Sequence, residues 1–184
     1  MKRIIPIEGP YRLKAVVQSD AITIFNIIQR ERSYLSDWLP FIQFSKHVQD
    51  TKSFIAHAIL QRNAGKDFLY KICEVDKLIG LIGTKDTDYF NKHTELGYWI
   101  SQEYQSKGIT TKANYSLIKE LFEDLKMERI QICCAVGNEK SIAIPNKLGF
   151  TFEGIRRNGE WVSENKYRDL KIFSLLKVEF NTQQ

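Results

Sequence analysis

The stretch Thr94–Ala113 reads T-E-L-G-Y-W-I-S-Q-E-Y-Q-S-K-G-I-T-T-K-A. Its first half predicts a strand, because apolar and other residues alternate over Glu95–Ile100 and aromatic residues gather near its end. Its second half predicts the start of a helix after the short polar loop 105–110. Such a loop leaves backbone N–H groups unpaired at the positive end of the helix dipole. The stretch therefore predicts an anion site, where Gly108 lets a phosphate approach the backbone closely.

The residues that follow extend this unit. Apolar positions continue the helix to Phe122, and Ile130–Val136 is apolar enough to form a buried strand. The order strand, helix, strand from residue 94 to residue 136 predicts a βαβ unit, whose strands are parallel neighbours with a right-handed crossover. Asn138 is then a good N-cap for a short helix over Glu139–Leu148.

The rest of the chain predicts further elements around this unit. One helix is expected to begin at Ser19 or Asp20, and a second to begin at Asp50 and Thr51 with Phe54 facing inward. Polar composition predicts loops at Lys85–Lys92 and Arg156–Asn165. The expected strands are Tyr11–Val17, Phe68–Glu74, Lys77–Thr84, Phe150–Glu153 and Tyr167–Leu176. Together these elements predict one mixed α/β domain over residues 1–184, with its core at about 10–178.

Composition excludes several classes of protein. With 184 residues, 43% of them hydrophobic, the chain is long enough for one substantial core. Its net charge is +5, but Lys and Arg are dispersed, so no nucleic-acid-binding arm stands out. Three cysteines without metal-ligand spacing favour a reduced cytoplasmic protein that holds no metal. We expect no membrane segment, because no apolar run approaches about 18 residues, and no secretion signal.

Two motifs, at a characteristic separation, resemble those of a known family. The loop has Gln105, Gly108 and Thr110 in a pattern similar to Gln/Arg-x-x-Gly-x-Gly/Ala, and a second motif runs from Asn138 to K-L-G-F at residues 147–150. Through these motifs and their strand order, nearly the whole chain resembles the GNAT superfamily of acyl-CoA-dependent N-acyltransferases. The resemblance implies a mixed α/β fold whose central sheet is mostly antiparallel, with one parallel pair splayed to bind CoA and helices on its flanks.

The resemblance implies acetyl-CoA as co-substrate and no metal. In the family, the N–H groups of the loop cradle the pyrophosphate of CoA, which agrees with the anion site predicted above. The pantetheine arm lies between the two parallel strands and adds backbone hydrogen bonds as an extra strand would. The expected cofactor-binding residues are Tyr98, Trp99, Ile100, Gln105, Ser106, Lys107, Gly108, Ile109, Thr110, Thr111 and Asn138.

Acetyl transfer to an amine requires a neutral amine, a donor for the developing oxyanion, and a proton or hydrogen bond for the leaving thiolate. An α-amino group has a pKa of about 7.7–8.0, so a weak base suffices. Glu95 fits this role at the start of the strand, directly or through water; the alternative is a partly exposed structural glutamate. A backbone N–H near Tyr98–Ile100 fits the oxyanion donor. We expect direct transfer without an acyl-enzyme.

The family acid is absent. Members usually have a tyrosine four residues before the glycine of the second motif, and here that position is Pro145. Ser141, in the first turn of the helix, can instead donate a hydrogen bond to the sulfur; the alternative is a serine that only helps to cap the helix. Pro145 has no N–H and crowds the carbonyl of Ser141, so we also predict a kink or a loosened turn there.

The acceptor is indicated by a third resemblance. Residues 32–40, which include Tyr34 and Trp38, are similar to a segment of the ribosomal-protein serine N-acetyltransferase branch, as is the run Tyr167-Arg168-Asp169. The resemblance implies an acidic ribosomal protein N-terminus as acceptor, with Tyr34, Trp38 and Glu95 as substrate-binding residues. An open aromatic groove near Trp38 would favour a peptide, whereas an acidic cleft would favour a polyamine or an aminoglycoside. A non-catalytic acyl-CoA-binding domain and a homo-oligomer both remain open.

Overall fold

The computed structural model describes residues 1–182, and eight strands within them form one sheet. The strands are β1 (Ile4–Pro6), β2 (Tyr11–Ala15), β3 (Leu69–Glu74), β4 (Lys77–Asp88), β5 (His93–Ile100), β6 (Arg129–Ala135), β7 (Thr151–Ser163) and β8 (Lys166–Leu176). Their order across the sheet is β1-β2-β3-β4-β5-β6-β8-β7. All neighbours are antiparallel except β5 and β6, which are parallel. The predicted mixed α/β architecture with one parallel pair is confirmed.

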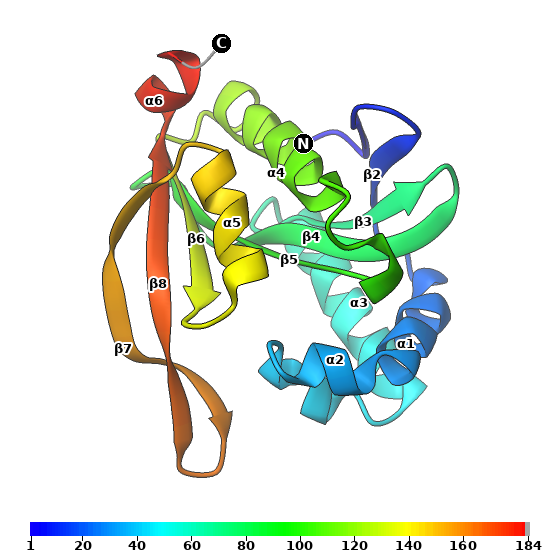
Figure 1. The fold of residues 1–184 in the computed structure, drawn as a ribbon. Helices are drawn as coiled ribbons and strands as arrows, with labels where there is room; N and C mark the ends of the chain where they lie inside the picture. Colours follow the sequence, from blue (N-terminus) through cyan, green and yellow to red (C-terminus); the bar gives the residue numbers. More distant parts are fainter. Residues whose placement is uncertain (183–184) are drawn as a thin grey trace.

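The helices are α1 (Asp20–Arg30), α2 (Arg32–Ser36), η1 (Pro40–Phe44), α3 (Val48–Asn63), η2 (Gln102–Tyr104), α4 (Ile109–Glu123), α5 (Glu139–Lys147) and α6 (Lys177–Thr182). In Figure 1, α1, α2 and α3 lie together, apart from α4 and α5. Successive side chains of a strand point to opposite faces, so β5 contributes to both of the resulting apolar clusters. Leu96 and Ile100 pack in the cluster that contains α4, whereas Trp99 packs in the cluster of α1, α2 and α3.

The parallel pair is splayed. Its registered partners run from His93 and Arg129 to Leu96 and Ile132, and within the described residues the pairing ends there. On its other side β5 stays paired with β4 as far as Ile100. The edge of β5 that faces β6 over Gly97–Ile100 therefore keeps backbone groups for another partner. The βαβ unit predicted from residues 94–136 is confirmed.

The C-terminal hairpin corrects the sequence prediction. The expected loop Arg156–Asn165 and the expected brief strand Phe150–Glu153 are instead parts of the 13-residue strand β7 and its turn into β8. Most of β7 is exposed, so polar residues occupy both faces and no alternation reveals a strand. Asn165 has φ 55°, a left-handed conformation that asparagine tolerates in tight turns.

Other predictions were wrong in detail. The expected loop Lys85–Lys92 is partly strand, because β4 continues past a bulge to Asp88. Phe54 was expected to face inward and is 48% exposed. Ser19 makes no side-chain cap; the Asp20 carboxylate accepts a hydrogen bond from the Val17 amide at 2.8 Å. The sequence analysis also missed β1, α2, η1 and α6. Among the described residues, none of the helices is both long and apolar enough to cross a membrane.

Candidate active site

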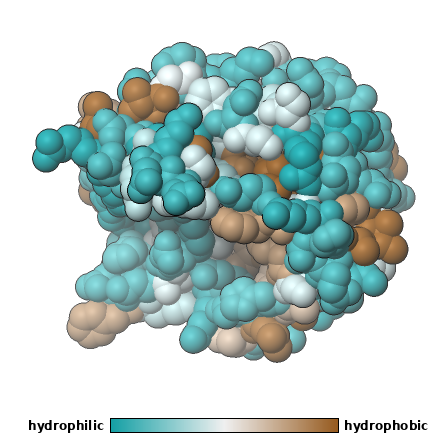
Figure 2. All heavy atoms as spheres, turned by 90° about the horizontal axis from the view of Figure 1, so that it is seen from below, coloured by the Kyte–Doolittle hydropathy of each residue, from teal (hydrophilic) through white to brown (hydrophobic). Residues whose placement is uncertain are grey.

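A cavity of about 1110 Å³ crosses the molecule at the splayed strands. Its lining comes from β4, β5 and β6, from the start of α4, from α5, and from the segment between α2 and η1. Figure 2 shows a hollow on this face with apolar side chains inside it. One cavity thus joins the predicted anion loop, the free edge of β5 and the aromatic segment at residues 34–41.

The predicted anion loop has the expected backbone form. Ser106 and Gly108 have positive φ values of 59° and 74°, and Gly108 is the N-cap of α4 in the left-handed conformation. No side chain caps this helix end, so the N–H groups of its first turn are available. Ile109, Thr110 and Thr111 line the cavity together with Ser106 and Gly108. A concave set of N–H groups at a helix N-terminus suits a phosphate group.

Two predicted loop residues behave differently from the rest. Gln105 donates through its amide nitrogen to the Tyr34 hydroxyl and accepts a hydrogen bond from Lys140 Nζ at 2.9 Å. Lys107 is not part of the cavity lining, and its Nζ lies 5.0 Å from the centroid of the Tyr104 ring. The cation that reaches the cavity near the loop is therefore Lys140, which the sequence analysis missed because it lies on α5.

The free edge of β5 brings three predicted cofactor residues to the cavity. Tyr98, Trp99 and Ile100 all line it, and Trp99 is 8% exposed while Ile100 is 7% exposed. Their side chains are fixed in the two apolar clusters, so this edge is held in place before any ligand binds. It can offer backbone hydrogen bonds to an extended arm.

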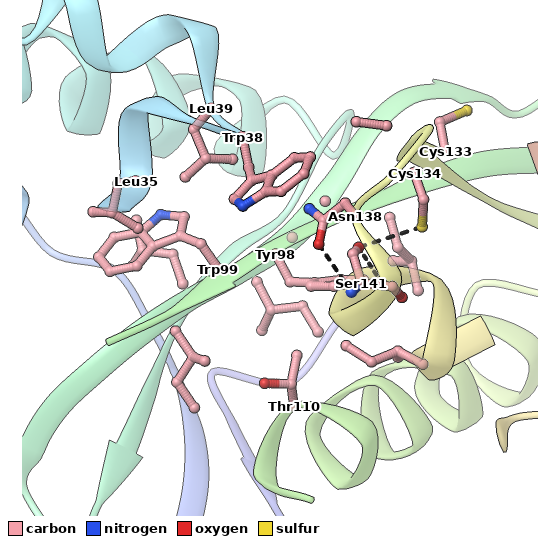
Figure 3. Close-up of a pocket in the computed structure, with 18 of the residues that line it drawn as sticks. Leu35, Trp38, Leu39, Tyr98, Trp99, Thr110, Cys133, Cys134, Asn138 and Ser141 are labelled. Atoms are coloured by element: carbon pink, nitrogen blue, oxygen red, sulfur yellow. Dashed lines mark hydrogen bonds between the residues drawn. The ribbon is translucent and has the colours of Figure 1, made fainter. Parts of the chain in front are cut away.

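Ser141 belongs to a small network of hydroxyl and thiol groups (Figure 3). Asn138 Oδ1 accepts from the Ser141 amide at 3.2 Å, which confirms Asn138 as the cap of α5. Ser141 Oγ lies 3.3 Å from Tyr98 Oη and 3.3 Å from Cys134 Sγ. Burial raises the pKa of Tyr98 well above its ordinary value, so its hydroxyl stays protonated and can donate.

Pro145 explains the remaining contact of this network. A proline has no N–H to give to the carbonyl four residues earlier, which is that of Ser141. Tyr98 Oη donates to this carbonyl at 3.3 Å. The helix α5 runs from Glu139 to Lys147, so Pro145 lies inside it and does not end it. The kink or loosened turn at this position stays a prediction. The strand tyrosine thus occupies the carbonyl that the proline leaves unpaired.

Glu95 lines the cavity, but its carboxylate already has partners. Lys85 Nζ lies 2.7 Å from one oxygen, and the other accepts from Gln131 Nε2 at 3.0 Å and from Cys133 Sγ at 3.2 Å. Its side chain is only 11% exposed, so Glu95 is more buried than the structural alternative assumed, and both the base role and the structural role stay predictions. Burial, and then the neighbouring Glu95 carboxylate, raise the pKa of Cys133 to about 12, which keeps this thiol protonated.

The aromatic segment forms the far wall of the cavity. Tyr34 and Trp38 line it as predicted, together with Leu39, Pro40 and Phe41. A second carboxylate, Glu160, also lines the cavity, and its oxygen lies 2.6 Å from Arg168 Nε. The sequence analysis missed Glu160 because it assigned that position to a loop. Among the described residues there is no group of His, Cys, Asp and Glu arranged to hold a metal ion.

A mostly antiparallel sheet with a splayed parallel pair, and an anion loop leading from the first strand of that pair, is the arrangement of acyl-CoA-dependent acyltransferases. Residues 11–151 match the model of the acetyltransferase (GNAT) domain, and the chain belongs to this family.

Individual members of the family are similar to this chain over much of its length. The chain is 44% identical over 107 residues to the putative ribosomal N-acetyltransferase YdaF of Bacillus subtilis (strain 168), a match that spans 58% of this chain and 58% of that protein. It is 25% identical over 174 residues to the ribosomal-protein-serine acetyltransferase of Escherichia coli (strain K12), covering 95% and 97% of the two chains. A solved structure of the microcin C7 self-immunity acetyltransferase MccE, in complex with acetyl-CoA and AMP, superposes with a TM-score of 0.89 at 26% identity. That match covers 96% of this chain and 97% of MccE.

Proposed function

We propose that this protein transfers an acetyl group from acetyl-CoA to a primary amine, and that the amine is the N-terminus of a ribosomal protein. The observation that carries the proposal is the single cavity joining the anion loop, the free edge of β5 and the aromatic wall. Family membership and the names of the two curated relatives support it. The acetyl-CoA found in MccE supports the co-substrate.

The residues fit CoA. The uncapped start of α4 and the left-handed backbone at Ser106 and Gly108 suit the pyrophosphate, and Lys140 adds a cation beside them. The edge Gly97–Ile100 suits the pantetheine arm. Three residues of the predicted cofactor set use their side chains for contacts within the protein, namely Gln105, Lys107 and Asn138. We propose that Gln105 and Asn138 help CoA binding by fixing the local backbone, and that Lys107 contributes its backbone. Bound acetyl-CoA supplies the reactive acetyl thioester.

The proton chemistry is assigned to groups of this chain. Ser141 Oγ donates a hydrogen bond to the leaving sulfur, and the Tyr98 hydroxyl, which donates to the Ser141 carbonyl at 3.3 Å, fixes the position of this turn of α5. Glu95 accepts the amine proton, through water, because Lys85 and Cys133 already occupy its carboxylate. An N–H of the free β5 edge near Tyr98 or Ile100 faces the oxyanion. With Cys133 held as a neutral thiol, no acyl-enzyme on this residue is required.

A peptide acceptor is favoured over a polyamine. Four carboxylates line the cavity: Glu95 pairs with Lys85, Glu160 pairs with Arg168, Asp67 accepts from the Thr87 hydroxyl at 2.6 Å, and Glu139 is exposed at the start of α5, next to Lys140. A polyamine needs carboxylates that are free to pair with its ammonium groups. The wall from Trp38 to Phe41 instead offers aromatic and apolar surface, which suits the first residues of a protein chain.

The proposal treats the described chain as one N-acetyltransferase domain, since β7 and β8 join the same sheet as the strands matched by the family model. We place the reaction in the cytoplasm, which fits three cysteines that are all unpaired. Neither a metal nor a nucleic acid is part of the proposed reaction.

The test is an acceptor panel with labelled acetyl-CoA: purified ribosomal proteins, a synthetic peptide with a free N-terminal serine, the same peptide with a blocked N-terminus, and spermidine. We expect label on the free peptide and on a ribosomal protein N-terminus, located by tandem mass spectrometry. Faster labelling of spermidine than of the peptide would show that the acceptor is a polyamine and not a protein N-terminus. Tight acetyl-CoA binding with labelling at the background level throughout would replace catalysis by a binding function.

A further inference from the structure

The end of the β7–β8 hairpin is attached to the aromatic wall. Arg168, on β8, donates from Nη1 to the carbonyl of Asp37 at 2.8 Å and from Nη2 to the carbonyl of Trp38 at 2.6 Å. Its third donor, Nε, reaches Glu160 at 2.6 Å. One side chain thus connects both strands of the hairpin to a segment about 130 residues earlier in the chain, as its sequence separations of 131 and 130 show.

The chemistry of this contact is specific to arginine. A guanidinium group is planar and always charged, and it carries donors in fixed directions, so it can bond two successive carbonyls and a carboxylate together. The Arg168 side chain is 16% exposed, so these bonds are partly protected from water. The two carbonyls follow the end of α2, where a helix leaves carbonyls unpaired and favours a nearby positive charge.

Two further contacts join the same surfaces. The amide of Gln43 donates to the carbonyl of Val162 at 3.0 Å and to that of Pro40 at 2.8 Å. The rings of Phe44 and Trp161 stack with their centroids 5.9 Å apart. The hairpin therefore contacts the wall at Trp38 and contacts η1, just after the wall, at Gln43 and Phe44.

Besides Arg168, the wall is supported on both sides of Trp38: Leu39 packs against the apolar cluster of α1, α2 and α3, and Arg32 donates to the carbonyl of Ile42 at 2.7 Å. The nearest fully buried side chains are those of Leu35 and Ile42, and the residues between them are half-buried or exposed. The Trp38 and Leu39 backbone amides donate to the carbonyl of Leu35. The carbonyls of Asp37 and Trp38 accept from Arg168 instead. Figure 3 shows Trp38 and Leu39 on the side of the cavity opposite Ser141.

We propose that Arg168 is a positioning residue for the acceptor: it holds Trp38 in the cavity wall and thereby sets how well the acceptor binds. This inference rests on the proposed function. Arg168 acts through the backbone of Trp38 and through Glu160, and it does not contact the anion loop. Its loss should therefore weaken acceptor binding and leave acetyl-CoA binding unchanged.

The test compares Arg168→Gln and Arg168→Lys with the control Arg129→Gln. Arg129, on β6, makes a similar arginine–carboxylate pair with Glu153 of β7 at 2.6 Å, and neither residue lines the cavity. With the N-terminal serine peptide, we expect Arg168→Gln to raise KM for the peptide about tenfold or more, while KM for acetyl-CoA stays within about twofold. Lysine keeps the charge but cannot bond both carbonyls, so Arg168→Lys should lie between the wild type and Arg168→Gln.

Backbone hydrogen exchange over residues 37–44 separates this inference from the proposed function. We expect faster exchange in Arg168→Gln than in Arg129→Gln, because the segment loses its attachment. If the wild type acetylates no amine, the proposed function fails and the role of Arg168 toward the acceptor fails with it; faster exchange would then show only that Arg168 holds Trp38 in place. If Arg168→Gln matches Arg129→Gln in both exchange and peptide KM, the inference is wrong.

Discussion

The two sides of the cavity are built in different ways. The proposed cofactor side is a loop of consecutive residues, 105–111, whose backbone N–H groups form the proposed anion site. The acceptor side joins residues 37–44 to residues 160–168 through side-chain bonds. A change in the backbone of the loop should therefore mainly alter acetyl-CoA binding, and a change at residues 160–168 should mainly alter acceptor binding. Gln105 joins the two sides through its hydrogen bond to Tyr34. The two sides meet at Glu95, Tyr98 and Ser141.

The largest effect is expected in the reactivity of Cys133, whose thiol donates to Glu95 where the two sides meet. Its pKa of about 12 leaves roughly 10⁻⁴ of the thiol ionised at pH 8, so iodoacetamide should react about three orders of magnitude more slowly than in the unfolded chain. Mass spectrometry of the Cys133 peptide after timed pulses measures the rate. The thiolate is the reactive form, and its fraction grows with pH until the pKa of about 12 is reached. The alkylation rate of Cys133 should therefore keep increasing beyond pH 9.

The variant Glu95→Gln is the matched test of the cause. It removes the negative charge and leaves the side chain nearly the same size, so the pKa of Cys133 should fall and alkylation at pH 8 should accelerate. An unchanged rate would show that burial alone controls this thiol, and it would weaken the link between Glu95 and the reaction centre.

The second effect is on the cofactor side. Gly108→Val places a β-branched residue at φ 74°, which distorts the loop and should lower acetyl-CoA affinity about 100-fold by calorimetry. The control is Gly65→Val, since Gly65 has φ 68°, is similarly open around its α-carbon, and lies outside the cavity lining. Both variants should lose similar stability. Equal losses of acetyl-CoA affinity would contradict a specific role of the loop.

The third effect is on the transfer step. Ser141→Ala removes the proposed hydrogen-bond donor to the leaving sulfur, and kcat should fall about 10- to 30-fold with little change in KM for either substrate. Ser106→Ala is the control, because the loop is proposed to bind through its backbone. A kcat that Ser141→Ala leaves unchanged would reduce Ser141 to a first-turn residue of α5.

The same contrast explains what the sequence could predict. The cofactor loop, the parallel pair and the cap at Asn138 depend on short runs of residues, and local patterns predict them. Glu160 lies on β7, where polar residues on both faces hide the strand. Arg168 lies on the last strand, which the sequence analysis predicted, but no local pattern indicates its partner 130 residues away. Even on the local side, the choice between Lys107 and Lys140 depended on packing, because Lys107 turns toward Tyr104.

The smallest effect tests how Tyr98 compensates for Pro145. Tyr98→Phe leaves the Ser141 carbonyl without its donor and should lower the free energy of unfolding by about 1–2 kcal/mol. Pro145→Ala restores an N–H that can bond this carbonyl within α5. In a double-mutant cycle measured by urea unfolding, Tyr98→Phe should therefore cost about 1 kcal/mol less in the Pro145→Ala background. If the effects of the two substitutions on the free energy of unfolding are additive, the tyrosine and the proline act independently. Tyr98 would then interact with the Ser141 hydroxyl only, and not with the Ser141 carbonyl.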